Sequence, residues 1–165
     1  MGRPYTILIY LAPIIPMLQL LLTLFISIFQ PALQPAEIGL YMLQDGTPVQ
    51  VSNFVMPTAG CEWSGVGGQV FNHTDSPVEG LLIQVKGTLE GVPIQQYAVT
   101  GSSLQFGQGG YEMMLSDHLV AGSLSVRLLD LAGQPLSAPI PLVLTPDCQK
   151  NLVIINLVEM LTPYS

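Results

Sequence analysis

The amino-acid sequence predicts an all-β fold, a seven-stranded antiparallel sandwich preceded by one N-terminal transmembrane α-helix. Three observations lead to this prediction: an uncharged apolar run near the N-terminus, short apolar segments of alternating hydrophobicity after it, and 16 glycines and 14 prolines that fall mostly between those segments. Glycine and proline placed in this way end strands and form turns more readily than they interrupt long helices.

The anchor is predicted from residues 5–29, which carry no formally charged side chain. At about 1.5 Å per residue a helix of this length extends roughly 37 Å, enough to cross a hydrocarbon core of about 30 Å. Arg3 precedes the run and no Lys or Arg follows it until Lys86, so the positive-inside rule places the N-terminus in the cytoplasm and the rest of the chain outside. A cleaved signal peptide is the alternative, but cleavage after Ala36 would leave Gln34 at the −3 position. We therefore predict an uncleaved signal anchor.

The segments around the anchor complete the predicted organisation. Residues 1–4 form a cytoplasmic stub, and residues 30–60 form a proline-containing linker. Within the linker, Asp45-Gly46 is a turn signal, so its apolar flanks form either an edge hairpin or a strand that joins the edge of the sandwich. The β-sandwich domain is expected at residues 61–158 and a C-terminal tail at residues 159–165.

The strand signals recur at the spacing of an immunoglobulin-like sandwich. Ile83 and Val85 share one face of their strand, opposite Gln84 and Lys86, so one face packs inward and the other meets water. Residues 152–155 are apolar on both faces, which suits a central strand or one covered by a partner. The seven predicted strands are 67–71, 81–85, 94–99, 111–115, 123–129, 140–144 and 152–158.

The two cysteines, Cys61 and Cys148, bracket the predicted domain. A disulfide between them would close a long loop and stabilise the fold by roughly 4 to 5 kcal/mol. The alternative is two unpaired buried thiols. We favour the disulfide because the predicted orientation places the domain outside the cytoplasm, where disulfides persist.

A G-x-V strand, a polar turn, P-V-x-G, an apolar strand that ends in glycine and a later G-x-Y-like element occur at residues 68–70, 77–80, 83–87 and 110–111. In these motifs the chain resembles the carboxypeptidase regulatory-like family, which implies a prealbumin-like β-sandwich. The resemblance covers about 50 residues directly, and the long Gly/Gln-rich loop at 102–110 departs from it. The Cys61-Glu62-Trp63 start is also similar to membrane-anchored envelope domains of Chloroflexota, from which no function is carried over.

Charge and motifs exclude several classes of function. The chain is 9% charged with a net charge of −7, and its four basic residues form no cluster, which disfavours nucleic-acid binding. The only imidazoles, His73 and His118, do not have the spacing of metal ligands, and no nucleophile elbow or phosphate-binding loop is present. We predict a protein that is not an enzyme and that uses no cofactor.

One polar turn offers two weaker alternatives. Asn72, Asp75 and Glu79 carry oxygen ligands suited to calcium, but the D-x-D-x-D-G pattern is absent and a hydrogen-bonded turn is favoured. Asn72-His73-Thr74 also fits the glycosylation acceptor pattern.

Aromatic residues are the candidate contacts for a ligand or a partner. Trp63, Tyr97 and Tyr111 form either a carbohydrate-stacking platform or part of the core, and core packing is favoured for at least two of them. Phe106 lies in the uncharged loop at 102–110, which we expect to be flexible and available for contact. Trp63, Tyr111 and Phe106 are therefore the predicted contact residues.

These predictions favour a non-catalytic structural or interaction protein, anchored in the membrane, that presents a β-sandwich to another envelope protein as an accessory subunit. The expected partners are membrane lipid and either a different protein or a second copy of the chain. Pro13 and Pro16 predict a kink in the anchor, so that either the kinked whole spans the membrane or its first part lies against another protein. The alternative function is a module that binds cell-surface carbohydrate.

Overall fold

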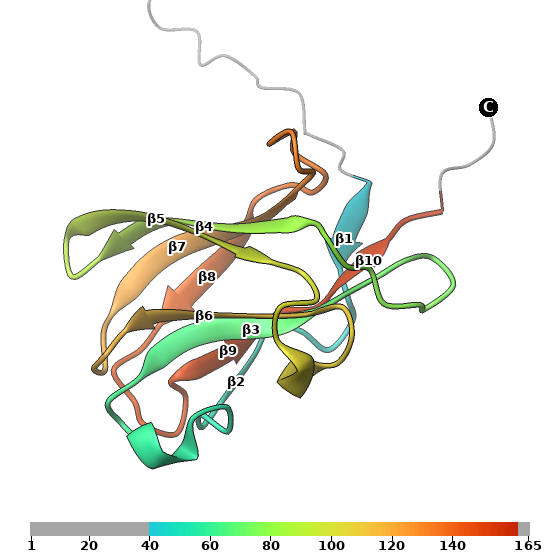
Figure 1. Ribbon diagram of the computed structural model, residues 1–165. Helices are drawn as coiled ribbons and strands as arrows, with labels where there is room; N and C mark the ends of the chain where they lie inside the picture. Colours follow the sequence, from blue (N-terminus) through green and yellow to red (C-terminus); the bar gives the residue numbers. More distant parts are fainter. Residues whose placement is uncertain (1–39, 162–165) are drawn as a thin grey trace, which may run out of the picture. The chain divides into compact units, whose positions relative to one another are not determined.

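In the computed structural model, which describes residues 40–161, two β-sheets pack face to face (Figure 1). Two single-turn 3-10 helices lie in loops, η1 (Pro57–Ala59) and η2 (Leu104–Phe106). The predicted all-β fold is confirmed. The strands of the first sheet are β1 (Tyr41–Leu43), β2 (Val49–Val51), β3 (Ser64–Phe71), β6 (Gly110–Ser116), β9 (Leu152–Ile154) and β10 (Leu157–Glu159). The second sheet has the order β5 (Val92–Val99), β4 (Leu82–Leu89), β7 (Gly122–Leu129) and β8 (Ile140–Leu144).

The predicted transmembrane anchor, residues 5–29, lies outside the described residues. Among residues 40–161, no helix is long and apolar enough to cross a membrane. The anchor and the topology that follows from it stay predictions.

All seven predicted strands are present, but the last one is broken in two at Ile155 and Asn156. The break has a local cause, because the Asn156 side chain takes part in hydrogen bonds on both sides of the strand. Its Oδ1 accepts the backbone N–H of Gln69 at 2.9 Å, and its Nδ2 donates to Gln44 Oε1 at 3.0 Å. The two halves, β9 and β10, follow each other along the same edge of β3.

The pairing of these halves corrects the expectation of a wholly antiparallel sandwich. β9 and β10 both run parallel to β3, whereas β6 pairs with the other edge of β3 in the antiparallel direction. A parallel pair needs a long connection, and residues 72–151 supply it by passing through the second sheet and back. Parallel pairing was not predictable from strand periodicity, which is the same in both arrangements.

The Asp45-Gly46 turn does not form the edge hairpin. β1 and β2 pair with β10 and β9, respectively, and together act as one interrupted edge strand. Between them a short turn is closed by the Thr47 N–H, which donates to the Gln44 carbonyl at 3.1 Å. The other alternative, a strand that joins the edge of the sandwich, is confirmed, so the sandwich begins before Cys61.

The main core lies between the two sheets and follows the predicted alternation. Ile83 and Val85 of β4 and Val126 and Leu128 of β7 are fully buried, at 0% exposure. Tyr111 of β6 is also fully buried, and its hydroxyl donates to the Ile155 carbonyl at 2.7 Å. Burial raises the pKa of this phenol, so it stays protonated and able to donate.

The sandwich has two distinct ends. β3 and β9 are parallel, so the segments that lead into both strands, with Cys61 and Cys148, lie at one end. At the opposite end the chain enters β1 and leaves β10, where the Met160 N–H donates to the Leu40 carbonyl at 2.8 Å (Figure 1). Both ends of the described chain therefore lie far from the cysteines.

Candidate functional site

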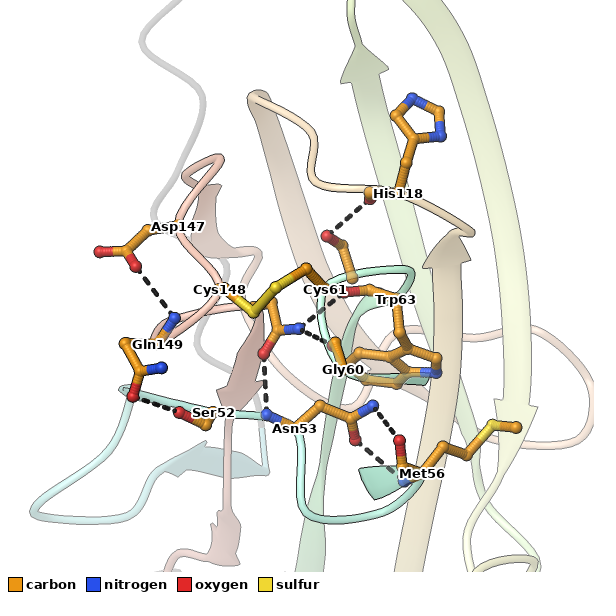
Figure 2. Close-up of a disulfide and its surroundings, with 12 residues drawn as sticks. Ser52, Asn53, Met56, Gly60, Cys61, Trp63, His118, Asp147, Cys148 and Gln149 are labelled. Atoms are coloured by element: carbon orange, nitrogen blue, oxygen red, sulfur yellow. Dashed lines mark hydrogen bonds between the residues drawn. A yellow bond between two sulfur atoms is a disulfide. The ribbon is translucent and has the colours of Figure 1, made fainter. Parts of the chain in front are cut away.

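A disulfide joins Cys61 to Cys148, as predicted, with the two Cα atoms 5.0 Å apart (Figure 2). It connects the segments that lead into β3 and β9, two neighbouring strands far apart in sequence. Cross-linking them removes loop entropy from the unfolded chain, an effect of about 4 to 5 kcal/mol for a loop of this size. The disulfide thus holds one end of the first sheet together.

Asn151, which follows Cys148 closely in the chain, is buried and connects several segments by hydrogen bonds. Its Nδ2 donates to the carbonyls of Gly60 and Trp63, both at 2.9 Å. Its Oδ1 accepts the backbone N–H of Asn53 at 2.8 Å, and its own carbonyl accepts the Gly65 N–H at 2.9 Å. Nothing in the sequence pattern singles out this residue, because an asparagine before a strand usually belongs to a turn.

Asn53 continues the network into the segment that carries η1. Its Oδ1 accepts the N–H groups of Val55 at 2.9 Å and Met56 at 3.0 Å, while its Nδ2 donates to the Met56 carbonyl at 3.1 Å. These bonds fold the segment after β2 back over the outer face of the first sheet (Figure 2).

Two aromatic rings fill the space that glycines leave on this outer face. A Cβ added to Gly65 would lie 2.5 Å from the Trp63 ring, and one added to Gly67 would lie 2.4 Å from the Phe106 ring. Trp63 and Phe106 belong to a second buried cluster with Val55. The glycines of β3 therefore allow aromatic side chains to pack directly on the strand backbone.

The three predicted contact residues are all core residues in the structure. Trp63 and Tyr111 have 0% exposure and Phe106 has 7%. The carbohydrate platform built from Trp63 and Tyr111 is therefore absent, and core packing, favoured for at least two of the three aromatics, is confirmed for both. The loop at 102–110 is not an open flexible surface, because η2 and the buried Phe106 ring hold it against the sheet. Only Tyr97, half exposed, keeps a surface position.

Large apolar side chains nevertheless remain exposed around the second cluster. Phe54 stacks at a tilt on Phe106, with ring centroids 5.4 Å apart, and is 47% exposed. Met114 pairs with Gly65 across β6 and β3, beside the Trp63 ring, and is half exposed. We call this surface the apolar face; its exposed members are Val49, Phe54, Met56, Leu104 and Met114.

The outer face of the second sheet carries more polar side chains, beside exposed Val99 and Val143. Its strand register places Gln84 between Tyr97 and Arg127, and Lys86 between Gln95 and Ser125. We call this surface the polar face; its members are Gln84, Lys86, Thr88, Pro93, Gln95, Tyr97, Ser123, Ser125 and Arg127.

His118 lies on the connection between β6 and β7, where both of its ring nitrogens have neighbours. Nδ1 lies 2.8 Å from Asp117 Oδ1 and 3.1 Å from Ser116 Oγ, and Nε2 lies 3.4 Å from Glu90 Oε2. In a Ser-His-Asp triad the nucleophile and the carboxylate occupy opposite nitrogens, whereas here Ser116 and Asp117 share Nδ1. Hydrogen bonds to Asp117 and then to Glu90 raise the pKa of His118 above its ordinary value.

His73 and Asn72, the other polar residues considered as ligands, form hydrogen bonds with neighbouring groups of the sandwich. His73 Nδ1 lies 3.1 Å from Glu159 Oε2, and the bond lowers the pKa of that carboxyl group. Asn72 Oδ1 accepts the N–H groups of Thr74 and Ser76, both at 2.9 Å, so the favoured hydrogen-bonded turn is confirmed. Within residues 40–161, no three His, Cys, Asp or Glu side chains come together in a way that could hold a metal ion.

No family model, curated protein or solved structure matches this chain in comparisons with known proteins. The resemblance to the carboxypeptidase regulatory-like family therefore stays a prediction. What the chain does has to be inferred from the surfaces of the sandwich.

Proposed function

We propose that this chain is a non-catalytic, membrane-anchored interaction protein that presents its β-sandwich outside the cytoplasm to a protein partner, as an accessory subunit of a membrane or envelope assembly. The observation that carries the proposal is the apolar face. Exposed Val49, Phe54 and Met114 lie on the side of the first sheet that carries the second buried cluster. Exposed large apolar side chains gathered on one side of a small domain mark an interaction site.

The composition of the apolar face favours a protein as the occupant. Phe54, Met56 and Met114 combine an aromatic ring with two flexible thioethers, residue types enriched at the centres of protein interfaces.

Met56 precedes η1, near the disulfide and at the end of the sandwich opposite the start of β1 (Figure 1). The disulfide supports the extracytoplasmic side, because such bonds persist in oxidising compartments. The geometry of His118 supports a non-catalytic role, since its carboxylate and hydroxyl neighbours are not arranged for nucleophilic attack.

The family resemblance concerns the type of β-sandwich. Its motifs at residues 68–70 and 83–87 fall in β3 and β4, and the one at residues 110–111 begins β6. This placement supports a carboxypeptidase regulatory-like, prealbumin-like module. The parallel pairing of β9 and β10 with β3 is a feature that the resemblance did not predict.

The test is partner retention by the full chain, extracted from its native membrane in mild detergent. Met114→Glu places a charge on the apolar face, and Val143→Glu, at a 58% exposed position of β8, is the matched control. We expect a protein to copurify at a fixed ratio with the wild type and with Val143→Glu but not with Met114→Glu.

A photo-crosslinking residue at position 56 identifies that protein and distinguishes a different chain from a second copy of this one. A wild-type chain that purifies alone as a monomer, or a Met114→Glu variant that keeps its partner, would contradict the proposal.

A further inference from the structure

The two edges of the second sheet differ in what lies beside them. β8 ends the sheet on one side, and there the Val143 carbonyl accepts the Nε2–H of Gln50 from β2 at 2.9 Å. A bridge between Tyr41 and Ser137 also brings the first sheet beside the segment that leads into β8. β5 ends the sheet on the other side, where no strand within residues 40–161 pairs with it except β4. The edge at β5 is therefore open, and a further strand can pair with its backbone groups.

The hydrogen bonds between β4 and β5 show which residues of β5 face this open edge. Thr100 follows β5, and its N–H donates to the Leu81 carbonyl at 2.8 Å. Because hydrogen-bonded and non-hydrogen-bonded pairs alternate along an antiparallel ladder, the even-numbered residues of β5 bond to β4 and the odd-numbered residues face outward. Pro93 fits this alternation, since its missing N–H falls at an outward position. The outward residues, all of them exposed, are Pro93, Gln95, Tyr97 and Val99.

The backbone groups at this edge form a specific pattern of donors and acceptors. The N–H groups of Gln95, Tyr97 and Val99 have no acceptor within the part of the chain that the structure describes. The Val99 carbonyl already accepts the Ser102 N–H at 3.2 Å, and Pro93 has a carbonyl but no N–H. The edge therefore lacks a donor at Pro93 and has an occupied acceptor at Val99.

These two irregularities match when β5 meets a second copy of itself in the antiparallel direction. With Gln95 opposite Tyr97 of the second copy, Pro93 lies opposite Val99 of the second copy. The Pro93 carbonyl accepts the Val99 N–H, and the N–H that proline lacks would have gone to a carbonyl that Ser102 already occupies. Each pair of Gln95 and Tyr97 exchanges two hydrogen bonds. A strand with ordinary backbone groups at every position would instead face a missing donor at one end and an occupied acceptor at the other.

The side chains of β5 also suit this pairing. The strand carries no charged side chain, so two copies bring no like charges opposite each other, although the whole chain has a net charge of −7. Its inward side chains Ile94 and Ala98 pack against the core but are only partly buried, whereas Ile83 and Val85 of β4 are fully buried. A strand added beside β5 would cover this margin of the core.

We propose that β5 pairs with β5 of a second copy of this chain, antiparallel and with Gln95 opposite Tyr97, so that two four-stranded sheets become one continuous sheet. The contact is made by backbone groups at the open edge of the second sheet. It goes beyond the proposed function, because the proposed protein partner docks on the apolar face of the first sheet.

Sedimentation of the full chain in density-matched detergent micelles measures the self-association, and two double variants test the register. Gln95→Glu combined with Tyr97→Glu places like charges opposite each other at both pairs and should weaken dimerisation about tenfold or more. Gln95→Glu combined with Tyr97→Lys places opposite charges at the same pairs and should dimerise at least as tightly as the wild type. Val143→Glu, on the occupied edge of the same sheet, is the matched control and should leave dimerisation unchanged.

A second pair of variants separates the backbone from the side chain. Gln95→Pro removes an outward N–H at a position that, like Pro93, does not bond to β4. It should weaken dimerisation about tenfold, since each pair of Gln95 and Tyr97 loses one hydrogen bond. Gln95→Ala keeps the N–H and should dimerise as the wild type does. Denaturant unfolding checks that each variant is folded, and the charge variants decide the question if Gln95→Pro is not.

A photo-crosslinking residue at position 97 identifies what pairs with β5, and we expect cross-links to the β5 peptide of a second copy. A wild type that does not self-associate, equal dimerisation of the two charge variants, or cross-links to a different protein would each overturn the inference. A chain that dimerises through β5 but loses no protein on Met114→Glu contradicts only the proposed function. A chain whose partner is lost on Met114→Glu but that does not dimerise contradicts only this inference.

Discussion

The two outer faces of the sandwich differ in how the chain uses them. The outer face of the first sheet is covered by its own loops, with Trp63 and Phe106 packed on the glycines of β3. The outer face of the second sheet carries Lys86, Thr88 and Tyr97, which are exposed. A face covered by buried contacts stabilises the fold, whereas a bare polar face is open to a ligand. Substitutions on the first should change the free energy of unfolding, and those on the second should leave it almost unchanged.

The largest effect is expected from removing the disulfide that closes the covered side. Cys61→Ser combined with Cys148→Ser should lower the free energy of unfolding by about 4 to 5 kcal/mol, because the unfolded chain regains the entropy of a long loop. Denaturant unfolding measures the change, and the wild type under reducing conditions should match the double variant. A loss below about 1 kcal/mol would show that the covered side is held by packing alone.

The next largest effect should come from the hub of the covered side. Asn151→Ala leaves the Asn53 N–H and the carbonyls of Gly60 and Trp63 without their partner, at a cost of about 2 to 4 kcal/mol. Hydrogen exchange should show faster exchange at the amide of Met56, which Asn53 holds.

The matched variant on the bare face is Gln84→Ala, which should cost less than about 0.5 kcal/mol in the same unfolding measurement. Equal costs for Asn151→Ala and Gln84→Ala would remove the distinction between the two faces.

A smaller effect tests the packing of aromatic rings on glycine. Gly67→Ala places a Cβ 2.4 Å from Phe106 Cζ, so the ring must shift, at a cost of about 1 to 3 kcal/mol. Thermal or denaturant unfolding measures it. In a Phe106→Ala background the same substitution should cost less, because the ring that it displaces is gone. An unchanged cost in that background would place the strain elsewhere.

The smallest effect concerns His118, which lies between the two faces. Its hydrogen bond to Asp117 raises its pKa, so Asp117→Asn should bring the pKa down toward its ordinary value of about 6.5, and Glu90→Gln should lower it less. NMR titration of the imidazole measures both changes. Because the pKa is raised in the folded state, the stabilisation is complete below the pKa of the unfolded chain and is lost as pH rises through the folded value. A titration that is unchanged by Asp117→Asn would contradict this assignment.

Much of the fold could be predicted from local pattern, because alternation is a property of each strand by itself. The burial of Ile83 and Val85 and the outward position of Lys86 follow from a period of two. The disulfide was also predictable, since only two cysteines bracket the domain. Residue type alone did not distinguish Tyr97 from Trp63 and Tyr111, because an aromatic ring suits a core and a ligand surface equally.

The amino-acid sequence by itself determined the strands, their inward and outward faces and the cysteine pair, since these depend on residue order along one chain. The tertiary structure decided which strands became neighbours, and therefore which aromatics were covered. Trp63 is buried where its ring packs on the glycines of β3, and Tyr97 is half exposed on β5, an edge strand of the second sheet. Such contacts join residues far apart in the chain, and a pattern along the sequence does not specify them.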